Sequence, residues 1–191
     1  TRMDTLVGEL LTLSRLETSN IPLEKESLKL VPFLKNIVED NQSIAQQNKQ
    51  TVTLSVEPRI PENATVCANE GYLYRAFDNV IRNAMNYSPA GSTILLSCYE
   101  DRHHLHIEIT DNGPGIREDQ IPHIFTAFYR ADSSASKPGT GLGLALTQHI
   151  MEQHNGKIMA ENIKPNGLKM HFILPKKKVN GKAEKPHPKT T

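Results

Sequence analysis

Residues 69–87 read NEGYLYRAFDNVIRNAMNY, which predicts an amphipathic helix with an unusual polar border. At about 100° per residue its apolar side chains share one face. They are Leu73, Phe77, Val80, Ile81 and Ala84. Asn69 is a suitable N-cap, and Asn79 and Asn83 stand one turn apart beside the apolar face although asparagine is a poor helix former. An amide oxygen can ligate Mg²⁺, so both amides could serve a polar site. For the bare spacing alone, a solvated helix edge is the better interpretation.

Downstream, a predicted strand leads directly into a carboxylate and two glycines. Residues 93–99 and 105–110 alternate and predict two paired strands around a turn at 101–102. The second strand runs into Asp111, Gly113 and Gly115. A carboxylate at a strand end can stand at the mouth of a cleft, and glycine lets the backbone approach a ligand closely. The alternative is a tight turn at Asn-Gly, but no second strand follows promptly.

A second glycine cluster opens another predicted helix, over residues 142–154. Gly139, Gly141 and Gly143 could free backbone N–H groups to hold a phosphate. The pattern is neither a P-loop nor a dinucleotide fingerprint, because no Gly-Lys-Ser/Thr follows it and no strand precedes it. The segment 113–139 is long for an ordered loop and predicts a mobile lid, with Arg130 and Lys137 within reach of a triphosphate.

The rest of the chain alternates between helical and strand patterns. Helices are expected over residues 1–18 and from 31 onward, and strands over 51–56, 64–68, 157–161 and 168–174. The expected fold is an α+β two-layer sandwich, a mixed β-sheet with three helices on one face, plus an N-terminal helix stub. We expect the first helix to be the end of a longer element; an amphipathic helix folded back on the core is the alternative.

Composition narrows the class of protein. The chain has 191 residues, with 22 basic and 21 acidic side chains. No stretch approaches the roughly 20 apolar residues of a bilayer span. Cys67 and Cys98 lack CxxC spacing, which argues against a zinc or redox pair, and the balanced charge argues against a nucleic-acid partner. Residues 175–191 hold six lysines and one glutamate, so a basic, disordered tail is expected there.

Taken in order, these motifs resemble one family. Asn79…Asn83, Asp111-x-Gly113-x-Gly115, Phe125-x-x-Phe128 and Gly139-x-Gly141-x-Gly143 are similar to the N, G1, F and G2 boxes of the GHKL (Bergerat-fold) ATPase superfamily. The detail resembles a sensor histidine kinase of two-component systems, notably residues 78–88, 124–130 and 139–144. Residues 10–17 look like the end of that family's dimerisation helix hairpin. The implied fold is the Bergerat ATP-binding fold.

The resemblance implies a role for each residue of the site. Asp111 would accept the adenine amino group, Asn83 would ligate Mg²⁺, and Asn79 would lie beside it at the phosphates. Asn79 and Arg130 are the expected catalytic residues, Arg130 steadying the γ-phosphate or the docked helices. The other expected nucleotide-binding residues are Tyr87, Gly113, Gly115, Phe128, Lys137, Gly139, Thr140, Gly141, Leu142, Gly143 and Leu144.

Two departures from the family stand out. The family usually has Lys or Arg where Asn86 stands, and Arg130 or Lys137 could substitute. The family's phosphoacceptor histidine, followed by an acidic residue and Thr-Pro, has no match among the eight histidines here. We therefore expect these histidines, His154 included, to be ordinary surface or edge residues, and the acceptor to lie upstream.

The resemblance also implies an organisation and partners. Residues 1–19 would end a dimerisation and phosphoacceptor helix hairpin, 20–175 would form the ATP-binding catalytic domain, and 176–191 the tail. The domain would transfer the ATP γ-phosphate to a histidine of the hairpin, for relay to an aspartate of a cognate response regulator. Its partners would be ATP, its own dimerisation helices in a homodimer, and that regulator. It would be a cytoplasmic domain of a protein anchored in the bacterial inner membrane.

Two other functions remain open at this point. A GHKL ATPase or an anti-sigma-type serine kinase would share the nucleotide motifs, although the Leu-Leu…Ser14-Arg15-Leu run and the Phe-Tyr-Arg run disfavour it. A degenerate module that only binds partners is disfavoured by intact Asn83 and Asp111, while Asn86 keeps it in consideration.

Overall fold

The computed structural model describes residues 2–18, 23–131 and 139–176. The helices are α1 (Arg2–Thr18), α2 (Leu30–Gln47), α3 (Glu70–Tyr87) and α4 (Gly143–Gln153), with a short 3-10 turn at Ile121–His123. The strands are β1 (Glu26–Lys29), β2 (Thr51–Val56), β3 (Thr65–Ala68), β4 (Thr93–Glu100), β5 (His104–Thr110), β6 (Lys157–Asn162) and β7 (Leu168–Pro175).

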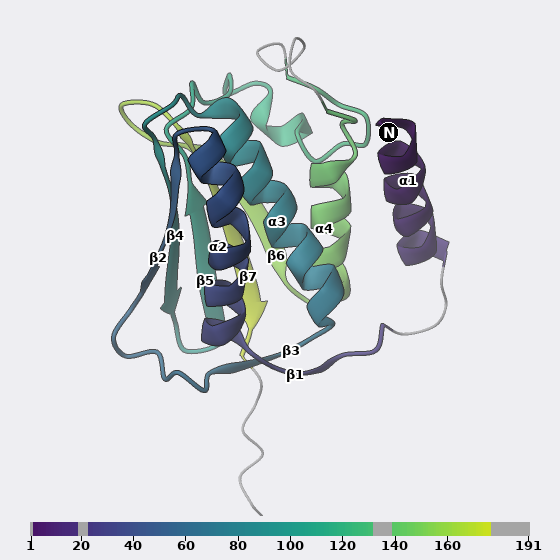
Figure 1. The fold of residues 1–191 in the computed structure, drawn as a ribbon. Helices are drawn as coiled ribbons and strands as arrows, with labels where there is room; N and C mark the ends of the chain where they lie inside the picture. Colours follow the sequence, from purple (N-terminus) through teal and green to yellow (C-terminus); the bar gives the residue numbers. More distant parts are fainter. Residues whose placement is uncertain (1, 19–22, 132–138, 177–191) are drawn as a thin grey trace, which may run out of the picture.

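Five strands form one mixed sheet in the order β2-β4-β5-β7-β6. The edge strand β2 pairs parallel to β4, and all other neighbours are antiparallel. Helices α2, α3 and α4 lie across one face of this sheet, and α1 stands outside them beside α4 (Figure 1). This two-layer arrangement confirms the predicted α+β sandwich.

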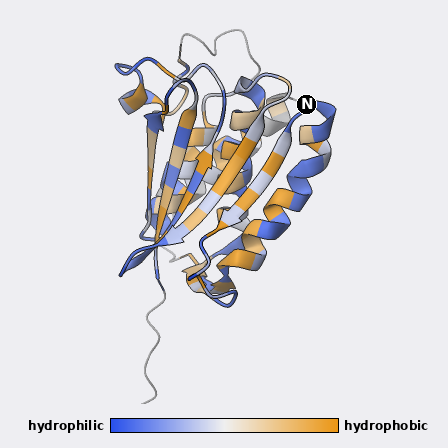
Figure 2. Cartoon of the chain, turned by 90° about the vertical axis from the view of Figure 1, so that its left-hand side faces the viewer, coloured by the Kyte–Doolittle hydropathy of each residue, from blue (hydrophilic) through white to orange (hydrophobic). Residues whose placement is uncertain are grey.

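Alternation along the strands creates the core between sheet and helices. On β5 the side chains of Leu105, Ile107 and Ile109 are buried, while the residues between them are only partly buried. Apolar and polar positions alternate along the strands in the same way in Figure 2. The Phe77 ring of α3 stacks on Phe172 of β7 with centroids 4.3 Å apart. All five residues predicted for the apolar face of the 69–87 helix are buried.

Two features differ from the sequence-based expectation. Residues 26–29 form β1, which pairs antiparallel with β3 in a separate two-stranded sheet. No strand was predicted there, because Glu26, Ser27 and Lys29 carry polar side chains and Leu28 is the single apolar residue of the segment. His154, expected at the surface or an edge, is instead buried at the junction of α4 and α3.

Candidate nucleotide-binding site

The C-terminal half of α3 supplies one wall of a cavity of about 310 Å³. Asn69 caps the start of the helix by accepting a hydrogen bond from the Tyr72 backbone N–H, as its sequence position predicted. Because the apolar stripe faces the core, the neighbouring stripe faces the cavity. That stripe places four polar side chains at the cavity, namely Asn79, Asn83, Asn86 and Tyr87.

Asn79 is held in place by α4. Its Nδ2 donates to Thr147 Oγ1 at 3.0 Å, and the Thr147 hydroxyl in turn donates to the Gly143 carbonyl at 2.9 Å. A Cβ at Gly143 would lie 2.4 Å from Asn79 Oδ1, so the missing side chain makes room for the amide. The second glycine cluster and the Asn79 amide therefore form one packed unit.

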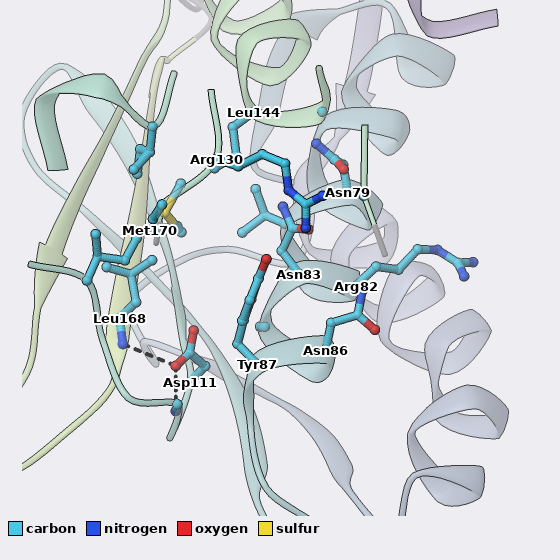
Figure 3. A pocket seen from close by; sticks show the side chains of 18 of the residues that line it. Asn79, Arg82, Asn83, Asn86, Tyr87, Asp111, Arg130, Leu144, Leu168 and Met170 are labelled. Atoms are coloured by element: carbon cyan, nitrogen blue, oxygen red, sulfur yellow. Dashed lines mark hydrogen bonds between the residues drawn. The ribbon is translucent and has the colours of Figure 1, made fainter. Parts of the chain in front are cut away.

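Asp111 follows the last residue of β5 and is 6% exposed. Its Oδ1 accepts hydrogen bonds from the backbone N–H groups of Gly113 (2.7 Å) and Leu168 (3.1 Å). Figure 3 shows the second carboxylate oxygen turned away from these donors. Burial raises the pKa of Asp111, and the two N–H donors oppose that rise. The carboxyl group is thus fixed by the backbone and presents one oxygen for a ligand.

Gly115, in the first glycine cluster, holds the loop after Asp111 close to β6. It has φ of +71°, and a Cβ there would lie 2.7 Å from Asn162 Oδ1. Asn162 accepts from the Ile116 N–H at 2.9 Å and donates to the Ile116 carbonyl at 2.6 Å. Sequence reasoning missed Asn162, because nothing near it in the chain shows that β6 ends against this loop.

The second glycine cluster meets the aromatic segment before it. Gly141 has φ of +76°, and a Cβ there would lie 2.8 Å from the Phe128 carbonyl carbon. The Phe128 N–H donates to the Gly141 carbonyl at 2.9 Å, while the Phe128 side chain is 61% exposed. Leu142 is fully buried in the core. Neither Phe128 nor Leu142 is among the residues that line the cavity.

The structure brings most of the predicted residues together around this cavity. The predicted residues that line it are Asn79, Asn83, Tyr87, Asp111, Gly113, Gly115, Arg130, Gly139, Thr140, Gly141, Gly143 and Leu144. Figure 3 shows Arg130 reaching toward Asn79 and Asn83 from the opposite side, with Asp111 at the other end. Lys137 lies outside the described residues.

Two charged residues at the cavity were not predicted. Arg82, one turn before Asn86, lines the cavity while pairing with Asp78 at 2.7 Å. Glu9 reaches the cavity from α1, and its Oε2 accepts from Thr140 Oγ1 at 2.6 Å. Arg82 could have been predicted from the sequence as a site residue, because it lies in the asparagine-rich stretch. Glu9 could not have been predicted, because 131 positions separate it from its partner Thr140.

The comparisons with known proteins agree with this geometry. A family model described as "Histidine kinase-, DNA gyrase B-, and HSP90-like ATPase" matches residues 68–178, more than half of the chain. The chain belongs to this ATPase family. Its motif order and its relatives identify it as the catalytic ATP-binding domain of sensor histidine kinases.

Two curated relatives show how much of such proteins the chain represents. Sensor histidine kinase WalK of Bacillus subtilis (strain 168) is 30% identical over 181 residues, 92% of this chain and 29% of WalK. Sensor protein KdpD of Clostridium acetobutylicum is 32% identical over 174 residues, 90% of this chain and 19% of KdpD. The chain therefore spans less than a third of either relative.

Solved structures of histidine kinases share the fold. The mycobacterial sensor histidine kinase MprB is 28% identical with a TM-score of 0.71, covering 79% of this chain and 98% of that one. Full-length ShkA, solved in complex with AMPPNP, has a TM-score of 0.78 at 23% identity, covering 90% of this chain and 35% of that one.

Proposed function

We propose that this domain binds ATP with Mg²⁺ in the cavity and transfers the γ-phosphate to a histidine on a separate helix hairpin. The observation that carries the proposal is the polarity of the cavity, which has a buried carboxylate at one end and amides with the Arg130 guanidinium group at the other. An adenine ring needs an acceptor for its amino group, and a triphosphate needs cations and hydrogen-bond donors. The ShkA complex with AMPPNP supports nucleotide binding in this fold.

Asp111 selects the base in this proposal. Its second oxygen accepts from the exocyclic amino group, while Gly113 and Leu168 hold the first oxygen. Ile109 and Met170 provide apolar surface at the same end of the cavity. Guanine carries a carbonyl where adenine carries the amino group, so a carboxylate here disfavours GTP.

The asparagine stripe holds the phosphates and the metal. Asn79 and Asn83 offer neutral amide oxygens, and the space left by Gly143 allows the Asn79 amide to sit against the start of α4. This donor set fits Mg²⁺, which keeps several waters and takes its remaining ligands from one or two protein oxygens and from substrate phosphates. Bound Mg²⁺ supplies neutralisation of charge on the phosphates. Arg130 adds positive charge at the same end.

The acceptor comes from outside the cavity. In the described part of the chain, no histidine lines the site. We infer that residues 1–19 end a dimerisation and phosphoacceptor hairpin whose preceding part carries the histidine, that residues 20–175 form the catalytic domain, and that the phosphoryl group passes on to an aspartate of a response regulator. Among the described residues no helix is long and apolar enough to cross a membrane. The whole protein is inferred to be anchored in the bacterial inner membrane, with this domain in the cytoplasm and working as a homodimer.

Labelled ATP tests the transfer. The chain incubated alone with γ-labelled ATP and Mg²⁺ should stay unlabelled, and adding a separate histidine-bearing hairpin of a related kinase should give a labelled hairpin. Asn83→Ala should abolish the label, whereas Asn36→Ala, a change at an exposed position of α2, should not. The label should be acid-labile, as phosphohistidine is. An acid-stable label on serine would instead support the serine-kinase alternative, and label on this chain alone would overturn the external acceptor.

A further inference from the structure

A cluster of metal-ligating side chains lies at the end of the sheet opposite to the nucleotide cavity. Asp101, His104 and His106 each place one ligand atom so that the three atoms lie within 4.8 Å of one another. His104 begins β5 and Asp111 follows its end, so about 20 Å of strand separates this cluster from the cavity. In Figure 1 the β4–β5 turn lies at the lower end of the sheet, away from the C-terminal end of α3 that lines the cavity.

We propose that Asp101, His104 and His106 bind one divalent transition-metal ion of the Zn²⁺ class. Two imidazole nitrogens and one carboxylate oxygen are a typical ligand set for Zn²⁺, Cu²⁺ and Ni²⁺. The fourth position is left for water, as in zinc sites with three protein ligands.

Both imidazoles lie close enough to the Asp101 carboxylate for one ion to be held among the three side chains. With metal–ligand bonds of about 2.0–2.1 Å, neighbouring ligand atoms lie about 3.3 Å apart. Asp101 Oδ2 lies 3.0 Å from His106 Nε2, and Asp101 Oδ1 lies 3.5 Å from His104 Nδ1. Residues 104 and 106 share one face of β5 because side chains alternate along a strand. This is the face that α2, α3 and α4 leave uncovered (Figure 1).

The turn orients the carboxylate before any ion binds. Asp101 Oδ1 accepts from the backbone N–H groups of His103 and His104, both at 2.7 Å. This leaves Oδ2 directed at His106.

A metal-ligating histidine commonly donates its second ring N–H to a neighbouring acceptor, and His106 has such a neighbour. Its Nδ1 lies 2.9 Å from His171 Nε2 on β7, and its ring stacks on Tyr99 of β4 with centroids 4.8 Å apart and planes 2° apart. A metal on Nε2 requires the proton to be on Nδ1, which then donates to His171. The Tyr99 hydroxyl continues the network to Glu108 at 3.1 Å.

A role in closing the turn alone explains fewer of these contacts than a metal site does. Asp101 alone closes the turn through the two backbone N–H groups, and the turn needs no imidazole at either 104 or 106. His104 Nδ1 lies 3.5 Å from Asp101 Oδ1, which is long for a hydrogen bond, yet the ligand atoms of the three residues lie within 4.8 Å of one another. The metal explains why one carboxylate and two imidazoles converge at this turn.

Zinc titration of the full chain, without an affinity tag and after chelator treatment, tests the site. Calorimetry should show one Zn²⁺ per chain, and Co²⁺ used as a visible-absorption probe should give the d–d bands of a tetrahedral site. His104→Gln and His106→Gln should each weaken binding by at least about tenfold, and His171→Gln by about 10–100-fold. His149→Gln, on α4 and away from the cluster, is the matched control and should bind as the unaltered chain does.

Two further variants separate this site from others. Cys67→Ser removes the exposed thiol and should leave binding unchanged, as should Asp111→Asn in the nucleotide cavity. Circular dichroism without metal should show that His104→Gln folds normally, because its side chain does not close the turn. Zn²⁺ affinity that is unchanged in both His104→Gln and His106→Gln, or the absence of saturable binding at one equivalent, would overturn the proposal.

Discussion

Gly143 illustrates how a single missing side chain serves the site. A Cβ there would lie 2.4 Å from Asn79 Oδ1 and 2.6 Å from Nδ2, so Gly143→Ala must push the amide out of its hydrogen bond with Thr147. Alanine favours a helix by about 1 kcal/mol over glycine, so the substitution should not destabilise α4 itself. We predict that Gly143→Ala weakens ATP affinity by about tenfold or more, measured by calorimetry with Mg²⁺ present.

Gly139→Ala is the matched control for this change. Gly139 also lines the cavity, but a Cβ there would meet no atom within 4 Å. Its ATP affinity should therefore change little. Equal losses in the two variants would show that the glycines act through backbone freedom rather than through the space beside Asn79.

His154 links two helices through both ring nitrogens. Its Nε2 accepts from the Asn69 N–H at 2.9 Å, so the proton is on Nδ1, which donates to the Ile150 carbonyl at 2.6 Å. Burial lowers the pKa of His154. In the unfolded chain this histidine therefore binds a proton near pH 6.5, whereas in the folded chain it stays neutral at that pH. The stability that this histidine contributes is complete above about pH 6.5 and is lost as the pH falls below it.

His154→Gln should reduce this acid sensitivity. We expect the free energy of unfolding at pH 8 to fall by about 1–3 kcal/mol, since two buried hydrogen bonds are disturbed. Its decline between pH 6.5 and pH 5 should also be shallower than in the unaltered chain, as urea unfolding at several pH values would show. Partial burial lowers the pKa of His171 as well, so the free energy of unfolding of the variant should still decline somewhat with falling pH. A slope identical to that of His149→Gln would contradict the assignment.

At this scale the sequence predicts residue type and order better than partners. Asn79, Asn83 and Asp111 were predicted because the order of their motifs along the chain resembles one family, although each motif alone is ambiguous. The burial of His154 depends on Asn69, 85 positions away, and Glu9 depends on Thr140. Neither contact leaves a local pattern, so neither could be predicted.

At the scale of elements, α1 is held against the domain by a small set of contacts. Leu13 and Leu16 are each 8% exposed, and Arg75 Nη1 donates to Thr12 Oγ1 at 2.7 Å. The other side of the helix is open, since Leu10 and Leu11 are 50% and 55% exposed. Because α1 belongs to the core only through one face, its docking should be separable from the folding of the sheet.

We predict that Leu13→Ala with Leu16→Ala releases α1 without unfolding the domain. Amide hydrogen exchange should become fast throughout α1, while protection in α3 and β5 should persist. Leu10→Ala with Leu11→Ala is the matched control, made at a concentration where sedimentation shows a monomer, and should leave α1 protected. If both pairs expose α1 equally, or if α3 loses protection along with it, the docking face is assigned wrongly.

Predictability at this scale depends on composition as well as on length, since the four-residue β3 was predicted over residues 64–68. The 69–87 helix and strands β4, β5 and β7 repeat their pattern over seven residues or more and were predicted within one or two residues. Strand β1 has four residues, three of them exposed, and exists because β3 offers it a partner. The parallel pairing of β2 with β4 likewise depends on tertiary packing rather than on either strand's own sequence.

At the scale of the whole molecule, nucleotide binding at this site should be coupled to the free energy of unfolding. Asp111 follows β5, the asparagines lie on α3, and Gly143 begins α4, so a nucleotide bound as we propose would contact three elements that separate on unfolding. A ligand that binds only the folded state stabilises it by about 2.7 kcal/mol at 100 times its Kd. For a chain of this size, 1 kcal/mol raises Tm by roughly 2–4 °C.

We therefore predict that ATP with Mg²⁺ at about 100 times its Kd raises Tm by roughly 5–10 °C, measured by calorimetry. GTP at the same concentration should give a much smaller rise, because the fixed Asp111 carboxylate meets a carbonyl rather than an amino group. Asp111→Asn should lose most of the ATP-induced rise, since a charge-assisted hydrogen bond contributes about 1.5–3 kcal/mol. Asp119→Asn, an exposed carboxylate paired with Arg117, should keep it. Equal rises with ATP and GTP would show that the buried carboxylate does not select the base, and would leave only the phosphate end of the cavity to explain binding.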